Sequence, residues 1–319
     1  MNILEIKNLN LSFQLDSGIY KALYDISLDI KQGQMHALVG ESGCGKTMTA
    51  MSIINLLPKN AIINSGEIVY NGKELIGLDE RELQKIRGSE IALIPQDPMT
   101  SLNPLYTIEN QLLEIILKDK KITKKEARAK AIEVLKKVKI ADAESKIKSY
   151  PHELSGGMKQ RVIIAMALLT NAKLIIADEP TTALDVTIQS EIMKILNEIK
   201  TEYGTSILLI THDLNLVGEY ADEISVMYSG RIVEEADKNE FFKNTIHPYS
   251  KALFNALPSN AKDGVLMQID GQPPNIKEII EGCRFYPRCQ EKDSINCKEV
   301  PVLTDIGNCH KVACIQKTK

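Results

Sequence analysis

The first stretch that could do chemistry is a glycine-rich run near the N-terminus. Residues Gly40–Thr47 read GESGCGKT, which fits the phosphate-binding pattern G-x-x-x-x-G-K-[ST] between an apolar strand, Met35–Val39, and an expected helix. Glycines let the backbone curl so that successive N–H groups face phosphate oxygens. The lysine adds a positive charge, and the threonine hydroxyl can ligate Mg²⁺. The predicted ATP-binding residues of this run are Gly40, Ser42, Gly43, Cys44, Gly45, Lys46, Thr47 and Met48.

Two adjacent carboxylates form a second candidate site. The run Leu174–Glu179 places Asp178 and Glu179 at the end of a buried apolar strand. Two acids at such a position are unfavourable unless a cation or a polar site meets them. We expect Asp178 to hold Mg²⁺ and Glu179 to orient and deprotonate an attacking water. A simple turn at Pro180 is the alternative, and the phosphate-binding run favours the catalytic interpretation.

Cysteines form a third set, and they are unevenly placed. Only Cys44 lies in the first 282 residues, and the others are Cys283, Cys289, Cys297, Cys309 and Cys314. In a reducing compartment such clustering indicates metal or iron–sulfur ligation more often than disulfides. Four thiolates suit either a cluster or tetrahedral Zn²⁺, and unligated or partly oxidised thiols are the third alternative. Cys44 is a candidate for a lowered pKa, because it lies near Lys46 and a helix N-terminus.

An α/β framework is predicted to position these residues. The runs Ile91–Ile94, Leu174–Ala177 and Ser206–Ile210 are short and apolar, as is typical of buried parallel strands. A mostly helical insertion is expected at about 100–160. Within it, the run TKKE that starts at Thr123 has the spacing of a capping box. The apolar positions behind this box line one helical face: Ala127, Ala131, Val134, Leu135 and Val138.

Length and composition limit the class of protein. A chain of 319 residues suggests about two domains. Prolines and cysteines become frequent after His247, so we divide the chain into 1–245 and an irregular extension, 246–319. A net charge of −3, 5% aromatic residues and no Trp argue against a nucleic-acid binder. The longest apolar run, Val162–Leu169, is far shorter than the ~18 residues that span a bilayer, and the N-terminus lacks signal-peptide features.

A further motif gives the chain a specific resemblance. Residues Leu154–Arg161, LSGGMKQR, are similar to the signature sequence of the ATP-binding-cassette (ABC) ATPases, and the Asp-Glu strand follows closely. The resemblance covers residues 3 to about 240 and implies an α/β phosphate-loop core with a helical subdomain. In that family two domains pair head to tail. It implies that Ser155, Gly156 and Gly157 cap ATP held by the opposite phosphate loop.

Four other positions resemble family motifs in the same order. Gln96 resembles the glutamine loop that contacts Mg²⁺ and the water, and Asp185 resembles the loop that crosses the dimer interface. His212 resembles the switch histidine that contacts the γ-phosphate, which with Glu179 and Gln96 completes the implied catalytic set. Phe13 lies where the family carries an aromatic that stacks on adenine. A core strand residue is the alternative there.

Within the family, the chain resembles the ATPases of dipeptide and oligopeptide importers. The similar segments are Gln96–Pro104, Ser155–Met166 and His247–Leu253. This implies an ATPase subunit that powers peptide uptake from the cytoplasmic face of the cell membrane. The implied partners are a second, homologous ATPase, two transmembrane permeases and an extracytoplasmic peptide-binding protein. An importer for nickel or another small solute is the alternative, because such subunits do not themselves bind cargo.

The same resemblance gives the C-terminal cysteines a meaning. Some importer ATPases carry a [4Fe–4S] cluster on a four-cysteine motif here, and the matching positions are Cys283, Cys289, Cys297 and Cys314. Cys309 is extra and is an alternative fourth ligand, while Zn²⁺ is the alternative metal.

A nucleic-acid machine of the same ATPase family is the rival class. Chromosome-type members insert a long coiled coil between the phosphate loop and the signature, whereas this interval is only residues 48–153. Ribosome-type members carry two cassettes in one chain, and this chain has one signature. We therefore expect no nucleic-acid partner.

Overall fold

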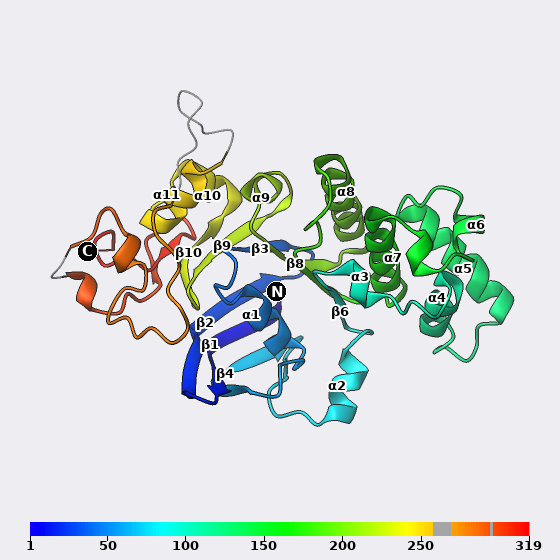
Figure 1. Cartoon of the computed structure of the whole chain (residues 1–319), viewed down its shortest axis with the longest axis horizontal. Coiled ribbons are helices and arrows are strands. Elements are labelled where there is room, and N and C mark those ends of the chain that lie inside the picture. Colours follow the sequence, from blue (N-terminus) through cyan, green and yellow to red (C-terminus); the bar gives the residue numbers. More distant parts are fainter. Residues whose placement is uncertain (258–268, 294–295, 319) are drawn as a thin grey trace. The chain divides into compact units, whose positions relative to one another are not determined.

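The computed structural model describes residues 1–257, 269–293 and 296–318. Its internal contacts divide the chain into two compact units. Unit 1 combines Met1–Leu78 with Leu209–Lys319, and unit 2 is the continuous segment Asp79–Leu208 (Figure 1). The chain thus leaves unit 1 after its N-terminal part and returns to it through strand β8, Ser206–Thr211.

Unit 1 begins with an antiparallel sheet in the order β2-β1-β4-β5. Alternating apolar residues place one face of β1 and β2 in the core, and in the hairpin between them Phe13 lies opposite Tyr20. The strands of this sheet are β1 (Asn2–Leu15), β2 (Gly18–Lys31), β4 (Ala61–Tyr70) and β5 (Lys73–Glu74).

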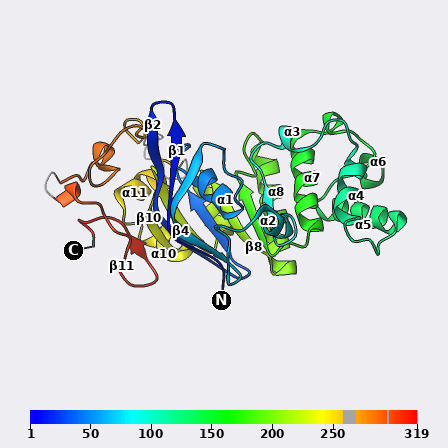
Figure 2. The same cartoon turned by 90° about the horizontal axis from the view of Figure 1, so that it is seen from below.

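A second set of strands in unit 1 carries the glycine-rich loop. Strand β3 is buried throughout and pairs parallel with β9, while β10, β12 and β11 continue from β9 in antiparallel pairs. Figure 2 labels β10 and β11 of this set. These strands are β3 (Met35–Val39), β9 (Glu223–Tyr228), β10 (Arg231–Asp237), β11 (Thr304–Asp305) and β12 (Lys311–Val312). The helices are α1 (Lys46–Ile53), α9 (Leu214–Tyr220), α10 (Lys238–Lys243) and α11 (Pro248–Asn255).

The C-terminal extension shares the core of unit 1. Phe285, next to the short 3-10 helix Tyr286–Arg288, is 3% exposed and belongs to the same apolar cluster as Val39 and Phe241. Its ring centroid lies 5.1 Å from that of Tyr228 and 5.3 Å from that of Tyr249. The described part of the extension therefore packs its apolar side chains into the core formed with β3, β9 and β10.

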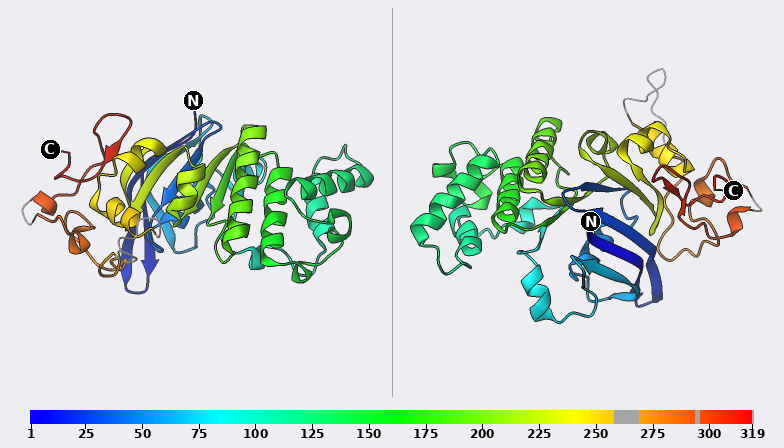
Figure 3. Two further views of the ribbon diagram at one scale, coloured as in Figure 1. Left: turned by 90° about the horizontal axis from the view of Figure 1, so that it is seen from above. Right: turned by 180° about the vertical axis from the view of Figure 1, so that it is seen from behind.

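Unit 2 contains the parallel pair β6 and β7 and most of the helices, drawn in cyan and green in Figure 3. Its strands are β6 (Ile91–Ile94) and β7 (Leu174–Asp178). Its helices are α2 (Glu80–Ile86), α3 (Pro98–Ser101), α4 (Ile108–Ile116), α5 (Lys124–Lys137), α6 (Ala143–Lys146), α7 (Gly156–Leu169) and α8 (Val186–Tyr203), with a 3-10 turn at Pro151–Glu153.

The sequence predictions for local structure are confirmed at several points. The predicted strands β3, β6, β7 and β8 are present, β7 and β8 each one residue longer than expected. The capping box forms at α5: Glu126 N–H donates to Thr123 Oγ1, and Thr123 N–H donates to Glu126 Oε2. The five apolar positions behind it are all buried. Within the described residues, no helix has both the length and the apolar character needed to cross a membrane.

Candidate functional site

The glycine-rich loop in unit 1 links buried β3 to the start of α1. Gly45 caps α1 with φ 113°, and Gly43 has φ 78°. A Cβ at Gly45 would lie 2.7 Å from Leu23 Cδ2, so the position needs glycine both for its backbone and for space. Ser42 and Gly43 are exposed, which leaves the turn of the loop open to solvent. This is the strand–loop–helix context that the motif requires.

Lys46 is held inside the loop. Its side chain is buried, and Nζ donates hydrogen bonds to the carbonyl oxygens of Gly40 (2.7 Å) and Glu41 (3.0 Å). These bonds fix a positive charge beside the backbone amides of the loop. A triphosphate placed there would meet both the amides and the ammonium group.

Cys44 does not behave as the sequence suggested. The side chain is only 5% exposed, and burial raises the pKa of its thiol more than the nearby Lys46 lowers it. The expectation of a lowered pKa was therefore wrong. Desolvation disfavours the thiolate, and at this position it outweighs the attraction of the ammonium group.

The two predicted carboxylates lie at the end of β7 in unit 2. Asp178 is buried, and Glu179, the next residue, has φ 46°, an uncommon backbone conformation for a non-glycine residue. Glu179 Oε2 accepts hydrogen bonds from Gln96 Nε2 at 3.1 Å and from Thr182 Oγ1 at 2.8 Å. The structure thus brings together Gln96 and Glu179, which the sequence places 83 positions apart. Thr182 is a contact that the sequence gave no reason to select.

The signature residues lie on a second face of unit 2. Ser155 caps α7, and its Oγ accepts a hydrogen bond from Met158 N–H; Asp185 caps α8 and accepts one from Ile188 N–H. A Cβ on Gly157 would lie 2.8 Å from Ile188 Cγ2, so the two helix starts are closely packed. A hollow of about 530 Å³ lies on this face, lined by Ser155, Gly156, Gly157, Leu184 and Asp185 among others. The signature and the predicted interface loop therefore share one open surface.

The structure places the two remaining ATP-site candidates in unit 1. His212 is exposed and follows β8 directly. Phe13 is half-buried on β1 beside Tyr20, whose ring carries Lys277 Nζ at 5.7 Å from its centroid. Their roles toward the γ-phosphate and adenine stay predictions.

The cysteines fall into two groups. Cys283 has its pKa raised to about 11, chiefly by burial, with smaller contributions from the neighbouring thiols of Cys297, Cys314 and Cys289. Cys309 is exposed. It makes a small contribution to the raised pKa of Lys31, which is caused chiefly by the hydrogen bond with Glu223. The structure therefore separates Cys309 from the other four.

The predicted metal centre is not supported by this arrangement. Among the described residues, no three or more His, Cys, Asp or Glu side chains are placed so that they could hold a metal ion. Without a metal, burial raises the pKa values of the Cys283, Cys289 and Cys314 thiols. As placed, the described thiols are not gathered into the four-ligand set that a [4Fe–4S] cluster or tetrahedral Zn²⁺ requires.

Two contacts to the glycine-rich loop come from residues to which the sequence assigned no function. Tyr249 is fully buried, and its hydroxyl oxygen accepts a hydrogen bond from Glu41 N–H at 2.9 Å. Arg288 forms an ion pair with the Glu41 carboxylate. Tyr249 lies in the segment His247–Leu253, which the sequence marks only by a family resemblance, and no local pattern connects residues more than 200 positions apart.

The chain is similar to known proteins over nearly its whole length. Residues 23–182 match the family described as "ABC transporter", and residues 233–297 match "Oligopeptide/dipeptide transporter, C-terminal region". It is 43% identical to the oligopeptide transport ATP-binding protein OppD of Escherichia coli (strain K12), covering 98% of this chain and 93% of the relative. It is 42% identical to the dipeptide transport ATP-binding protein DppD of Bacillus subtilis (strain 168), covering 98% and 94%.

Solved structures show the same fold. A dimeric post-hydrolysis state of the ATP-binding cassette MJ0796, bound to ADP and Pi, matches with a TM-score of 0.67 and 30% identity. The match covers 74% of this chain and 98% of that one. The predictions of an ABC ATPase fold, of ATPase activity coupled to transport and of a peptide-importer subunit are confirmed. This chain belongs to the ABC transporter ATP-binding proteins, in the group with the oligopeptide/dipeptide transporter C-terminal region.

Proposed function

We propose that this chain binds MgATP on the loop Gly40–Thr47, hydrolyses it with Glu179 as the base, and so drives di- and oligopeptide import through partner permeases. One observation carries the catalytic part of the proposal. Glu179 follows a buried strand that ends in Asp178, and its carboxylate is fixed by two donors, Gln96 and Thr182. A carboxylate held in one orientation is what a water-activating base requires.

The loop supplies the binding of the triphosphate. Its amides and the Lys46 ammonium group would meet the phosphate oxygens, and the positive end of α1 adds to their attraction. Phe13 is the proposed partner of adenine, since an aromatic face binds a base without a demand on its hydrogen bonds. His212 is proposed to contact the γ-phosphate as an exposed imidazole at the end of a strand.

The donor set also suits Mg²⁺. The hydroxyl of Thr47, the carboxylate of Asp178 and the amide oxygen of Gln96 are hard oxygen ligands of the kind that Mg²⁺ prefers. When bound with ATP, the ion would neutralise charge on the phosphate oxygens. Glu179 would then accept a proton from the attacking water, while the bond from Gln96 keeps its carboxylate oriented.

The signature face supports assembly with a second ATPase. Ser155 leads a helix whose first turn and adjoining hollow are open in unit 2. A helix N-terminus favours anions, so ATP held by another subunit is a suitable occupant. We propose that two such subunits pair head to tail around two ATP molecules, and that closure and reopening of the pair move the attached permeases.

An apolar groove in unit 2 supports contact with a permease. It has a volume of about 370 Å³ and is lined largely by apolar side chains on β6, α4 and α7, including Leu93, Ile115, Ile163 and Met166. Leu105, on the loop between α3 and α4, is 81% exposed. We propose that a segment of a permease lies here and that the chain therefore works at the cytoplasmic face of the membrane, together with an extracytoplasmic peptide-binding protein.

We propose separately that Cys283, Cys289, Cys297 and Cys314 hold a metal centre. Two observations support this: their spacing in the sequence, and the electrostatic effect by which, in addition to burial, the other three thiols raise the pKa of Cys283. The test is anaerobic purification followed by assays of iron, sulfide and zinc and by absorbance near 400 nm. Iron with sulfide supports a [4Fe–4S] cluster, and zinc alone supports a structural Zn²⁺ site. Protein without any of them removes the proposal and leaves the ATPase assignment intact.

The transport proposal is tested in cells that carry Lys46→Ala in this chain. Uptake of labelled di- and oligopeptides should fall to the background level, because the loop loses the ammonium group that it needs for ATP. Uptake of labelled nickel should be unchanged, which separates the peptide importer from the nickel alternative. The matched control is Lys59→Ala, an exposed lysine of the same unit, which should leave both activities unchanged. Normal peptide uptake in the Lys46 variant would contradict the proposal.

A further inference from the structure

The C-terminal extension contacts the ATP-binding loop through one arginine. Arg288 Nη1 lies 2.7 Å from Glu41 Oε2, and Arg288 Nη2 lies 3.0 Å from Glu41 Oε1. The pair is bidentate, with two parallel N–H···O bonds, which is the strongest and most directional form of an arginine–carboxylate contact. Glu41 is the second residue of the loop Gly40–Thr47, so the extension reaches the nucleotide-binding segment directly.

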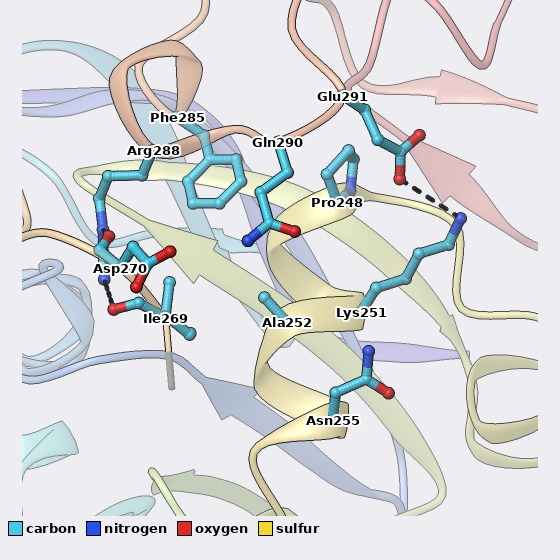
Figure 4. A pocket seen from close by; sticks show the side chains of 10 residues that line it. All are labelled: Pro248, Lys251, Ala252, Asn255, Ile269, Asp270, Phe285, Arg288, Gln290 and Glu291. Atoms are coloured by element: carbon cyan, nitrogen blue, oxygen red, sulfur yellow. Dashed lines mark hydrogen bonds and ion pairs between the residues drawn. The ribbon is translucent and has the colours of Figure 1, made fainter. Parts of the chain in front are cut away.

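This ion pair is built into the protein rather than lying on its surface. The side chain of Arg288 is 4% exposed and that of Glu41 is 25% exposed. Arg288 Nε donates to the carbonyl oxygen of Asp270 at 2.9 Å, and Nη2 to that of Ile269 at 3.4 Å. Figure 4 shows Arg288 turned toward Asp270 and Ile269, while Lys251 and Glu291 pair on the other side of a small hollow. The guanidinium group of Arg288 is therefore held in one orientation by bonds that do not involve Glu41.

The main chain of Glu41 is held by the same region. Its N–H donates to the hydroxyl oxygen of Tyr249 at 2.9 Å, and Tyr249 packs with Tyr228 and Phe285. Burial raises the pKa of Tyr249, so the phenol stays neutral. A Cβ at the preceding Gly40 would lie 2.2 Å from Met227 O, so this end of the loop packs closely against β9 and admits only glycine. The first turn of the loop is thus fixed through both the backbone and the side chain of Glu41.

Charge gives this contact a consequence for ATP. A carboxylate on a loop that binds a triphosphate repels the ligand unless a cation neutralises it. Lys46 bonds to carbonyl oxygens of the loop, including that of Glu41, whereas the two carboxylate oxygens of Glu41 face Arg288. Arg288 is therefore placed to remove the negative charge of Glu41 from the field that ATP meets.

We infer that Arg288 is a positioning residue for ATP binding: from the C-terminal extension, it neutralises Glu41 and fixes the phosphate loop in its binding conformation. The inference rests on the proposed ATP binding at Gly40–Thr47. It gives the extension a task in the ATPase reaction that does not depend on any metal at the cysteines. Loss of Arg288 should weaken ATP binding more than it slows the turnover of bound ATP.

The experiment measures MgATP affinity by calorimetry on the purified full chain, with thermal unfolding recorded for every variant. Arg288→Ala should raise the Kd for MgATP by about ten-fold, which corresponds to one uncompensated charge near the phosphates. Adding Glu41→Gln to Arg288→Ala should bring the Kd back to within about two-fold of the wild type, because the repelling carboxylate is then gone. Raising the salt concentration should shrink the difference between Arg288→Ala and the wild type.

Arg284→Ala is the matched control. Arg284 is also a buried arginine of the extension, but its bonds go to Ser229 Oγ (2.9 Å) and the Tyr24 hydroxyl (3.1 Å). It should lower thermal stability without a change in the Kd for MgATP. A merely structural role for Arg288 would give the same result as this control, with no rescue by Glu41→Gln and no dependence on salt.

The outcomes separate this inference from the proposal on which it rests. Wild-type protein that binds no ATP overturns the proposed function. Wild-type protein that binds ATP, with an unchanged Kd in Arg288→Ala or no recovery in the double variant, overturns the role of Arg288 alone. Should Arg288→Ala fail to fold, Arg288→Lys and Arg288→Gln replace it. Weaker MgATP binding by the Gln variant than by the Lys variant supports the inference, and equal MgATP binding by the two variants contradicts it.

Discussion

Gln96 Nε2 donates a hydrogen bond to Glu179 Oε2 over 3.1 Å, which links the two residues of unit 2 that are assigned to hydrolysis. The bond comes from the segment after β6 and ends on the residue after β7. Because β6 and β7 are parallel, their carboxyl ends lie at the same edge and bring the two side chains together.

Replacing Glu179 by Gln should leave ATP binding intact and nearly abolish turnover. The amide has the size of the carboxylate but cannot accept the proton of the attacking water. A general base typically contributes about 10²- to 10⁴-fold to the rate, and a loss of that order is expected. Phosphate release and the Kd for MgATP should be measured on the same preparation. Normal turnover of ATP in this variant would show that Glu179 is not the base that activates the attacking water.

Removing the bond from Gln96 should have a smaller effect. In Gln96→Ala, Glu179 keeps its bond from Thr182 Oγ1 at 2.8 Å but loses the other donor that orients it. We expect kcat for ATP to fall by about ten-fold, less than in Glu179→Gln. The double variant Gln96→Ala, Glu179→Gln should be no slower than Glu179→Gln alone. Additive losses would show that the two residues act independently.

The signature serine should act on ATP held by the other subunit. Ser155→Arg fills the open N-terminus of α7 with a long side chain and removes the cap on Met158 N–H. Trapping of azido-ATP with vanadate in the assembled transporter should then fall on the partner ATPase and persist on this chain. A loss confined to this chain would contradict the head-to-tail arrangement.

Cysteine alkylation should follow burial. Cys44 is 5% exposed and burial raises the pKa of its thiol, whereas Cys309 is exposed. Iodoacetamide near pH 7.5 should therefore modify Cys309 first and leave Cys44 unmodified in the folded protein. Peptide mass spectrometry after a short reaction distinguishes the two sites. Rapid modification of Cys44 would show that the phosphate loop opens readily.

The docking of the C-terminal strand should depend on pH through His310. Its Nε2 lies 2.8 Å from the buried Glu234 Oε1 and its Nδ1 lies 3.6 Å from Glu240 Oε1. The hydrogen bond with Glu234 is the largest cause that raises the pKa of His310 above its usual 6.5. The protonated form is therefore favoured in the folded state. Its stabilisation is complete below about pH 6.5 and is lost as the pH rises through the raised value.

Thermal unfolding between pH 5.5 and 8.5 tests this dependence. The difference in Tm between the wild type and His310→Gln should be largest at the acidic end and shrink as the pH rises. His247, whose pKa burial lowers to about 4, is present in both proteins and so cancels from the comparison. A difference in Tm that is constant with pH would show that the protonation of His310 does not stabilise the fold.

The sequence by itself determined which residues could carry the chemistry. Each chemical motif is a local pattern that forms a single turn, strand end or helix start. The motifs are the loop Gly40–Thr47, the adjacent acids Asp178 and Glu179, and the signature Leu154–Arg161. The capping box at Thr123 and the buried strands were predictable for the same reason: their hydrogen bonds and apolar periodicity lie within a few residues.

Only the tertiary structure decided which residues meet. The bond between Gln96 and Glu179, the pair of Arg288 with Glu41, and the contact of Tyr249 with the loop join residues 83, 247 and 208 positions apart. The raised pKa of Cys44 likewise depends on burial by the fold, while its neighbours in sequence suggested the opposite shift. Desolvation and long-range pairing are properties of the packed chain, which no local pattern of residues contains.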